Sequence, residues 1–313
     1  MEKITIPFVF GIGSQRAGST FVSHLLNAIP KAYIHPLKEI HYFDSKYGIR
    51  HPQVLESFGR DRLALNIDSM SRYPGQGLLE LLADQIVSDF KLIQNPYCDQ
   101  HSYLYHFQSV LSRRQDISYL GESTPEYMLL PLAALTEIKS IVPNCKAVLI
   151  VRDPVKRFIS AFRFLSAHEP FRHEGNEALS KRALQMLESE DRWVQQQDQF
   201  NQYQRAIDTF EAAGIPVFVI VNEQLQSNLN DIVKHLEQFL EINLNPLIVN
   251  QLQGKRINQV DFIFHPSSEL IRALQQRYQA EEYQLPKATE FPSKLAKYIP
   301  QSWNPNGVTS SIR

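Results

Sequence analysis

Residues 6–20 read IPFVFGIGSQRAGST, an apolar run that passes into a glycine-rich turn. Such a run fits a strand buried on both faces, as in a parallel sheet covered by helices. The runs Lys146–Val151 (KAVLIV) and Pro216–Val221 (PVFVIV) have the same character. A helical pattern follows each strand, at Ser19–Ile29, Pro154–Leu165 and Leu229–Leu240. This alternation predicts an α/β fold with a central, mostly parallel sheet flanked by helices.

The turn between the first strand and its helix predicts an anion site. Backbone N–H groups and the positive end of the helix dipole face a ligand there, and Arg16 adds a forked cation. Residues 13–20 nearly match the spacing GxxxxGK[ST], but Ser19 replaces the lysine that would hold the β- and γ-phosphates of a nucleoside triphosphate. The loop therefore favours phosphate or sulfate binding over a kinase or NTPase site. The alternative is a glycine turn with a capped helix and no ligand.

Arg152 ends the second strand at the carboxyl edge, where open α/β sheets bind ligands. Asp153 suits a helix N-cap and Pro154 the first helical position. Ser160 lies three residues after Arg157, so the two side chains could share one face of the helix. Taken alone, the segment favours a capped helix with solvated arginines.

A second polar segment, residues 38–44, reads KEIHYFD. Glu39 and His41 are two residues apart beside aromatic side chains, so either could act as a general base. An extended chain would place Lys38 on the opposite face from both. Taken alone, the segment favours an edge strand with outward charged side chains.

Composition limits which ligands, metal sites and cellular locations we expect for this protein. The 32 basic and 33 acidic residues give a net charge of −1, which provides no global field for nucleic acid, an anionic membrane or a polyanionic polysaccharide. Cys98 and Cys145 lack metal or disulfide spacing, so we expect reduced thiols and no metal. No stretch suits a signal peptide or a membrane span, so we expect a cytoplasmic protein. Residues 51–114 suggest short helical stretches, and the polar residues 169–202 suggest helices and mobile surface around a cleft.

Taken in chain order, the glycine loop, the segment 38–44 and the segment around Arg152 resemble the sulfotransferase family. This family uses 3′-phosphoadenosine-5′-phosphosulfate (PAPS) and releases 3′-phosphoadenosine-5′-phosphate (PAP). The resemblance spans roughly residues 6–260 and includes GESTPEY at 121–127 and the stretch 216–240. It implies one sulfotransferase domain over residues 1–313 with a P-loop-like fold. The chain is also similar to the sulfotransferase domains of modular polyketide synthases of the curacin and olefin-synthase kind.

The resemblance also implies roles for individual residues. Arg16 would serve both catalysis and donor binding, and Glu39 matches the base of the glycan-type branch, with His41 as a supporting or alternative base. The late loop after Gly254 resembles the segment that closes over the nucleotide. The residues expected to bind PAPS are Gln15, Arg16, Ala17, Gly18, Ser19, Thr20, Arg152, Ser160, Arg256 and Asn258.

Two departures from the family pattern concern cations. Arg16 and Ser123 stand where the family usually has lysines. Lys38, His41 and His265 are candidates to replace the lysine missing at 123.

The implied reaction is in-line transfer of a sulfuryl group from PAPS to an acceptor hydroxyl, without metal. Aromatic residues at 41–43 and 97–107 predict an acceptor with apolar parts. The polyketide resemblance suggests a 3-hydroxyacyl chain on an acyl carrier protein. The alternatives are a small-molecule or nucleotide kinase, which would need Mg²⁺, and a non-catalytic nucleotide-binding module.

Overall fold

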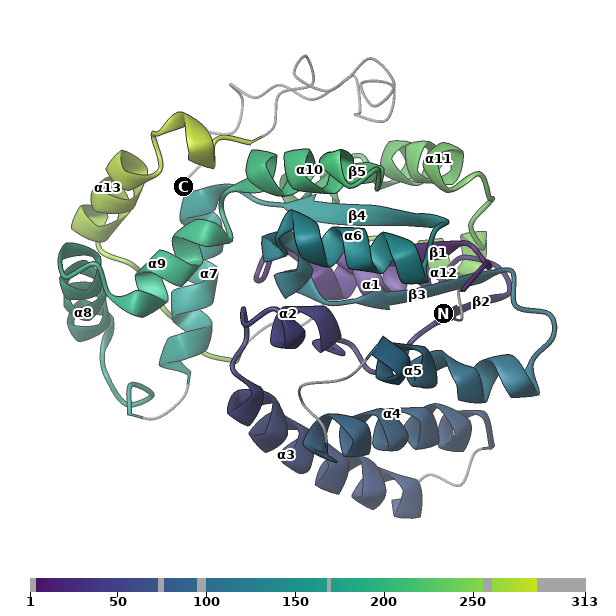
Figure 1. Cartoon of the computed structure of the whole chain (residues 1–313). Coiled ribbons are helices and arrows are strands. Elements are labelled where there is room, and N and C mark those ends of the chain that lie inside the picture. Colours follow the sequence, from purple (N-terminus) through teal and green to yellow (C-terminus); the bar gives the residue numbers. More distant parts are fainter. Residues whose placement is uncertain (1–3, 73–75, 95–99, 168–169, 256–260, 286–313) are drawn as a thin grey trace.

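The computed structural model contains a parallel β-sheet with helices on both faces (Figure 1). It describes residues 4–72, 76–94, 100–167, 170–255 and 261–285. The described strands pair in the order β2-β3-β1-β4-β5, and every pairing is parallel. The strands are β1 (Phe8–Ile12), β2 (Ala32–Ile34), β3 (Tyr119–Ser123), β4 (Cys145–Val151) and β5 (Val217–Val221). The α/β class and the three strands predicted from apolar runs are confirmed.

Alternate residues of each strand enter cores on opposite faces of the sheet. In β4, Val148 and Ile150 pack with one group of helices, whereas Leu149 and Val151 pack with the other. Apolar side chains cover both faces of the sheet, which is why polar and apolar residues do not alternate in the run KAVLIV. The first face carries α1 (Ser19–Leu26), α11 (Leu229–Leu240) and α12 (Pro246–Leu252); the second carries α6 (Leu132–Ile141) and α10 (Tyr203–Ala212). In Figure 1, α6 lies in front of the sheet and α1 behind it.

After the short helix α2 (Tyr42–Lys46), the chain between β2 and β3 forms long helices, so the prediction of short helical stretches over residues 51–114 is wrong. The long helices are α3 (Pro52–Arg72), α4 (Gln76–Gln94) and α5 (Gln100–Arg113). Leu65 and Ile67 of α3 remain exposed, and an ion pair joins Arg62 to Asp89 of α4. Because apolar residues lie on more than one side of α3, its periodicity is weak in the sequence.

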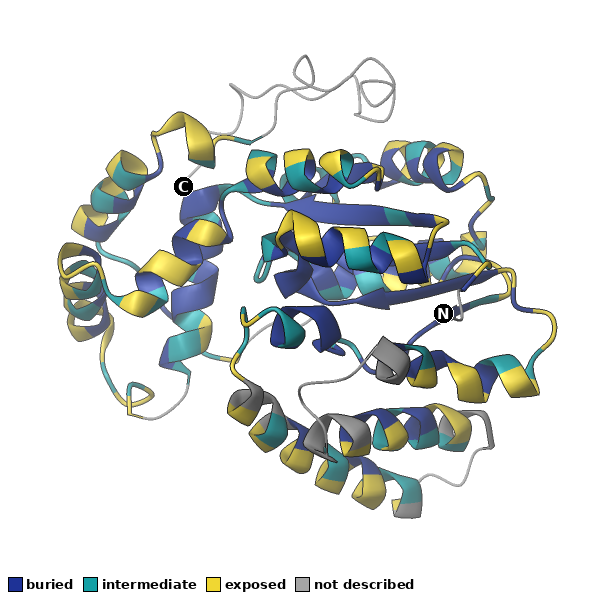
Figure 2. Ribbon diagram, in the orientation of Figure 1, coloured by how far each residue is buried: buried dark blue, intermediate teal, exposed yellow. Residues whose placement is uncertain are grey.

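A third apolar cluster holds α7 (Pro154–Ser166) against later helices of the chain. It joins α7 to α8 (Asn176–Glu188), α9 (Arg192–Gln199) and α13 (Ser268–Arg277). The expected helices within 169–202 are therefore present. Asp153 caps α7 by accepting a hydrogen bond from the Lys156 N–H over 2.8 Å, as predicted. Burial in Figure 2 follows this layering, with strands buried and the outer helix faces exposed.

Two further expectations concern cysteines and membranes. Cys145 is a free, buried thiol, and Cys98 lies outside the described residues. None of the described helices combines the length and apolar character needed to cross a bilayer.

Candidate active site

A cleft of about 1020 Å³ lies where β1, β4 and β5 end. Parallel strands bring their carboxyl ends to one edge, so segments distant in sequence converge there. Cations outnumber carboxylates among the described lining residues, which include Arg16, Lys38, Arg50, Arg152, Lys156, Arg163 and Lys255 against Glu39 and Glu223. The chain as a whole is nearly neutral, so this concentration of positive charge is local and suits a polyanionic ligand.

The loop after β1 is anchored to its neighbours. The Ser14 N–H donates to the Ile150 carbonyl over 2.6 Å, and the Ser14 hydroxyl donates to the Phe200 carbonyl over 2.8 Å. Gly18 caps α1 with φ 108° and provides no side-chain cap. The first N–H groups of a helix lack intrahelical partners. The loop and the start of α1 thus present backbone donors at the cleft, which Gln15, Gly18, Ser19 and Thr20 line.

Three arginines converge on the cleft without a carboxylate partner for each. Arg16, Arg152 and Arg163 all line it, and the Nε atom of each is buried without a hydrogen bond. Burial, followed by the charges of Arg163 and Arg152, lowers the pKa of Arg16. Burial also lowers the pKa of Arg152. Arginines that repel one another and whose buried Nε atoms lack a partner fit a phosphate or sulfate ligand, which would supply both charge and acceptors.

One face of α7 belongs to the cleft. Lys156, Ser160 and Arg163 are spaced by about one turn each and line it. Arg157 does not line the cleft: it is fully buried and donates to the Asn201 side chain and the Gln197 carbonyl. The expectation that Arg157 is solvated is therefore wrong. Burial requires its guanidinium to be satisfied by protein groups.

Within the segment Lys38–Asp44, residues 38–41 form no strand and Tyr42–Asp44 belong to α2, so the prediction of an edge strand is wrong. Glu39 and His41 adopt left-handed backbone conformations, with φ 71° and 58°. Lys38 is consequently not on the far side of the chain: its Nζ lies 2.6 Å from Glu39 Oε1. Burial alone would raise the pKa of Glu39, but the hydrogen bond with His41 and the charge of Lys38 outweigh it and lower that pKa.

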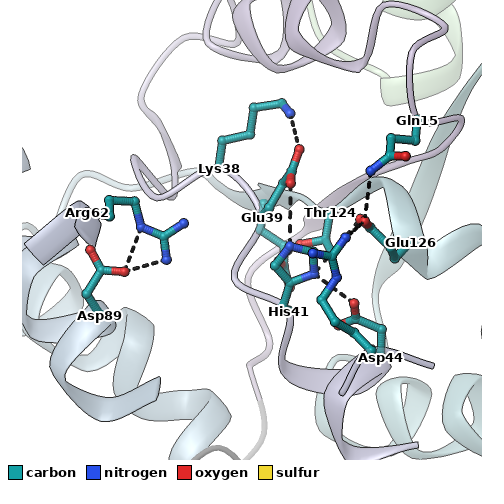
Figure 3. Close-up of polar contacts among 11 residues, drawn as sticks. Gln15, Lys38, Glu39, His41, Asp44, Arg62, Asp89, Thr124 and Glu126 are labelled. Atoms are coloured by element: carbon teal, nitrogen blue, oxygen red, sulfur yellow. Dashed lines mark hydrogen bonds and ion pairs between the residues drawn. The ribbon is translucent and has the colours of Figure 1, made fainter. Parts of the chain in front are cut away.

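Behind Glu39 lies a buried polar network that sequence reasoning missed (Figure 3). His41 Nδ1 lies 2.7 Å from Asp44 Oδ2, and Glu126 Oε1 accepts from the Gln15 amide over 3.3 Å. Arg50 forms an ion pair with Glu126. Burial raises the pKa of Glu126, although the charge of His41 opposes the shift. Asp44 and Glu126 stand within quoted motifs, but nothing local indicated that they would meet at His41.

Several predicted residues lie away from the cleft. Ala17 and His41 are buried behind its described lining, and His265 is exposed elsewhere. Ser123 is buried in β3 and is not among the lining residues. Arg50, which the sequence did not single out, lines the cleft together with Glu39. Gly254 and Lys255 line the cleft, whereas Arg256 and Asn258 lie outside the described residues.

The aromatic residues taken to indicate the acceptor form core. Tyr42, Phe43, Tyr103 and Phe107 are fully buried and pack together, so they do not define an acceptor pocket. Tyr97 lies outside the described residues. The apolar lining of the cleft comes instead from residues that include Phe164, Leu165 and Trp193.

Glu39, His41 and Glu126 bring ligand-type atoms within 4.8 Å of one another. Lys38 and Arg50 already pair with the two carboxylates, and the two nitrogens of His41 face different acids. The donor set is therefore that of an ion-pair network, and we do not assign a metal to it.

A parallel α/β sheet with a glycine loop and converging arginines at its carboxyl edge is typical of the α/β proteins that recognise phosphate or sulfate groups. More particularly, the chain belongs to the sulfotransferase family, whose model matches residues 7–246. The resemblance seen in the sequence motifs is thereby confirmed. Comparison with curated proteins finds no match.

Solved sulfotransferases are among the structures to which this chain is similar. One from Alicyclobacillus acidocaldarius is 16% identical with a TM-score of 0.52, covering 88% of this chain and 92% of that chain. The sulfotransferase domain of the Synechococcus PCC 7002 olefin synthase is 14% identical with a TM-score of 0.42, covering 91% and 97%. That of the curacin biosynthetic pathway is 15% identical with a TM-score of 0.41, covering 95% and 96%.

Proposed function

We propose that the protein transfers a sulfuryl group from PAPS to an acceptor hydroxyl. The observation that carries this proposal is the convergence of Arg16, Arg152 and Arg163 on the glycine loop, each with an unsatisfied buried Nε. Two phosphate positions and a sulfuryl group on one ligand match this arrangement better than a single phosphate does. The family membership of the chain supports the reaction class.

In this proposal the loop and the arginines divide the donor between them. Arg16, the loop N–H groups and the hydroxyls of Ser19 and Thr20 hold the 5′-phosphosulfate, while Arg152 and Ser160 hold the 3′-phosphate. The acceptor oxygen forms a bond to sulfur as the bond from sulfur to the bridging oxygen breaks, and PAP leaves. Fixed donors aimed at the charge that develops on the leaving phosphate are usually the largest catalytic contribution. Glu39 or His41 receives the acceptor proton.

Calorimetric titration without metal tests the donor. We expect PAP to bind far more tightly than 5′-AMP or ATP–Mg²⁺, and Arg152→Ala to weaken PAP binding about 10–100-fold, because charge-assisted hydrogen bonds are each worth about 1.5–3 kcal/mol. Arg182→Ala is the matched control, because Arg182 pairs with Glu174 outside the cleft. A preference for ATP–Mg²⁺ over PAP would contradict the proposal.

For the acceptor we propose a 3-hydroxyacyl chain carried on the phosphopantetheine arm of an acyl carrier protein. The cleft that contains Glu39 has cationic residues, Lys38 and Arg50, and also the apolar Phe164, Leu165 and Trp193. This mixture suits a phosphate-bearing arm attached to an acyl chain. The test is sulfation of 3-hydroxyacyl carrier protein, followed by mass spectrometry; sulfation of a free sugar or phenol in its place would exclude this acceptor.

A further inference from the structure

The His41 ring lies between two carboxylates. Its Nδ1 is 2.7 Å from Asp44 Oδ2, and its Nε2 is 3.4 Å from Glu39 Oε2 (Figure 3). Asp44 is fully buried at the start of α2, whereas Glu39 is partly exposed and lines the cleft. His41 is itself buried. A chain of contacts therefore runs from a buried acid, through an imidazole, to the carboxylate that faces the reaction space.

The numbers of hydrogen-bond donors and acceptors on His41 and its two carboxylate neighbours constrain the charge of the ring. An ionised carboxylate can only accept, and a neutral imidazole has one donor nitrogen and one acceptor nitrogen. A neutral ring would therefore turn a lone pair toward one carboxylate. Lys38 Nζ lies 2.6 Å from the other oxygen of Glu39 and keeps that group ionised. Both contacts are satisfied together when both nitrogens carry protons.

We propose that Asp44 is a positioning residue that keeps His41 doubly protonated, so that His41 holds the Glu39 carboxylate in place and Glu39 alone accepts the acceptor proton. This inference rests on the proposed function for its catalytic part. It selects between the two bases that the sequence left open. It also gives a role to Asp44, to which the sequence pattern assigned none. Asp44 acts through His41 and does not touch the reacting atoms.

The surrounding charges agree with this assignment. Burial would lower the pKa of His41, but Asp44 and Glu126 outweigh it and raise the pKa to about 10. Glu126 Oε2 lies 3.9 Å from Nδ1 and is buried without a hydrogen bond. The ionisable groups that face His41 from the packed elements are Lys38, Glu39, Asp44, Arg50 and Glu126, with Glu122 and Tyr127 interacting with Asp44 behind them.

The proton balance of the step is simple. The acceptor O–H proton passes to Glu39 as the new oxygen–sulfur bond forms, and the electron pair of the broken sulfur–oxygen bond stays on PAP. His41 remains a cation throughout. It stabilises the ionised form of Glu39 before transfer, and it fixes the orientation of the carboxylate.

The first test observes His41 directly and needs no acceptor. Nitrogen-15 spectra of histidine-labelled full-length protein, with PAP as the probe ligand, would be recorded at pH 8, with His41→Gln to assign the ring. We expect both His41 nitrogens to be protonated in the parent and one to be deprotonated in Asp44→Asn. A neutral His41 ring in the parent at pH 8 overturns the proposal, even if PAP binds and the proposed function stands.

The second test uses the rate with PAPS and a 3-hydroxyacyl carrier protein. Loss of the Asp44 charge lowers the pKa of His41, although Glu126 and Glu39 still raise it, so we expect kcat of Asp44→Asn to drop about tenfold or more from pH 6 to pH 8 at unchanged KM for PAPS. The parent should vary little over that window. A rate of Asp44→Asn that does not fall between pH 6 and pH 8 would refute the proposal.

Glu137→Gln provides the matched control for this rate experiment. Glu137 pairs with Lys46 at the other end of α2 and does not contact His41. Its profile should follow that of the parent. An absence of both PAP binding and turnover in the parent would instead overturn the proposed function, and the spectra would still decide the protonation of His41.

Discussion

The Asn222 amide, at the end of β5, donates a hydrogen bond to the Ala17 carbonyl over 2.7 Å. This contact joins the phosphate loop to a strand two positions away in the sheet. A Cβ at Gly18 would lie 2.9 Å from the same amide nitrogen. The contact therefore depends on the absence of a side chain at Gly18.

Gly18→Ala should consequently disable the loop. We expect PAP affinity to fall at least tenfold, because the new methyl group displaces Asn222 and φ 108° disfavours alanine. Calorimetric titration measures the loss. Gly214→Ala is the control, because Gly214 also has positive φ but has nothing within 4 Å of an added Cβ. It should cost about 1–2 kcal/mol of stability and leave PAP affinity intact; equal affinity losses in both variants would reject this explanation.

Arg163→Ala should weaken PAP binding about 10–100-fold. The reason is that Arg163 lines the cleft and its buried Nε has no protein partner. The same variant removes a repelling charge near Arg16. It should therefore leave the free protein as stable as the parent or more so, which thermal unfolding without ligand can measure. Unchanged PAP affinity would remove Arg163 from the site.

Position 16 permits a comparison of two cations. Arg16 has φ 64°, and its guanidinium carbon lies 4.7 Å from the Phe164 ring centroid. Arg16→Ala and Arg16→Lys carry similar backbone strain, so their difference isolates the charge. We expect kcat to fall by about 10²–10³ in Arg16→Ala and far less in Arg16→Lys. Equal rates in the two variants would show that the charge does not contribute.

Glu122 should make stability depend on pH. It is fully buried and accepts hydrogen bonds from Tyr103 and Thr124, and burial raises its pKa to about 7. A carboxyl whose folded pKa is raised destabilises the protein once it must ionise, so stability falls as pH rises from about 4.5 to 7. Urea unfolding should show Glu122→Gln gaining about 3 kcal/mol relative to the parent between pH 4 and pH 8. A pH-independent difference would contradict this.

The strands that the sequence revealed were those made of continuous apolar runs; β3 is equally buried but contains glycine, glutamate and serine. β1, β4 and β5 are continuous apolar runs, so their burial is visible in composition alone. β3 reads YLGES, and β2 has only three residues, so neither stands out. Their place in the sheet depends on pairing with distant partners, which no local pattern encodes.

The donor side of the candidate site was more predictable than the acceptor side. The glycine loop and Arg152 follow strands directly, so their position follows from the topology. The surroundings of Glu39 instead depend on two left-handed residues and on Glu126, which lies in the 3-10 helix Pro125–Leu129 that follows β3. Arg163 was missed because a helical arginine twelve residues after the end of β4 resembles ordinary surface charge.

The chain leaves the sheet through β2 and returns through β3, its direct neighbour. The intervening segment carries Lys38, Glu39 and Arg50, whereas Arg16, Arg152 and Arg163, assigned to the donor in the proposal, follow β1 and β4. Because the segment begins and ends on neighbouring strands, it can be exchanged as one insert. A chimera joined at β2 and β3 would change the side proposed for the acceptor and keep the side proposed for the donor.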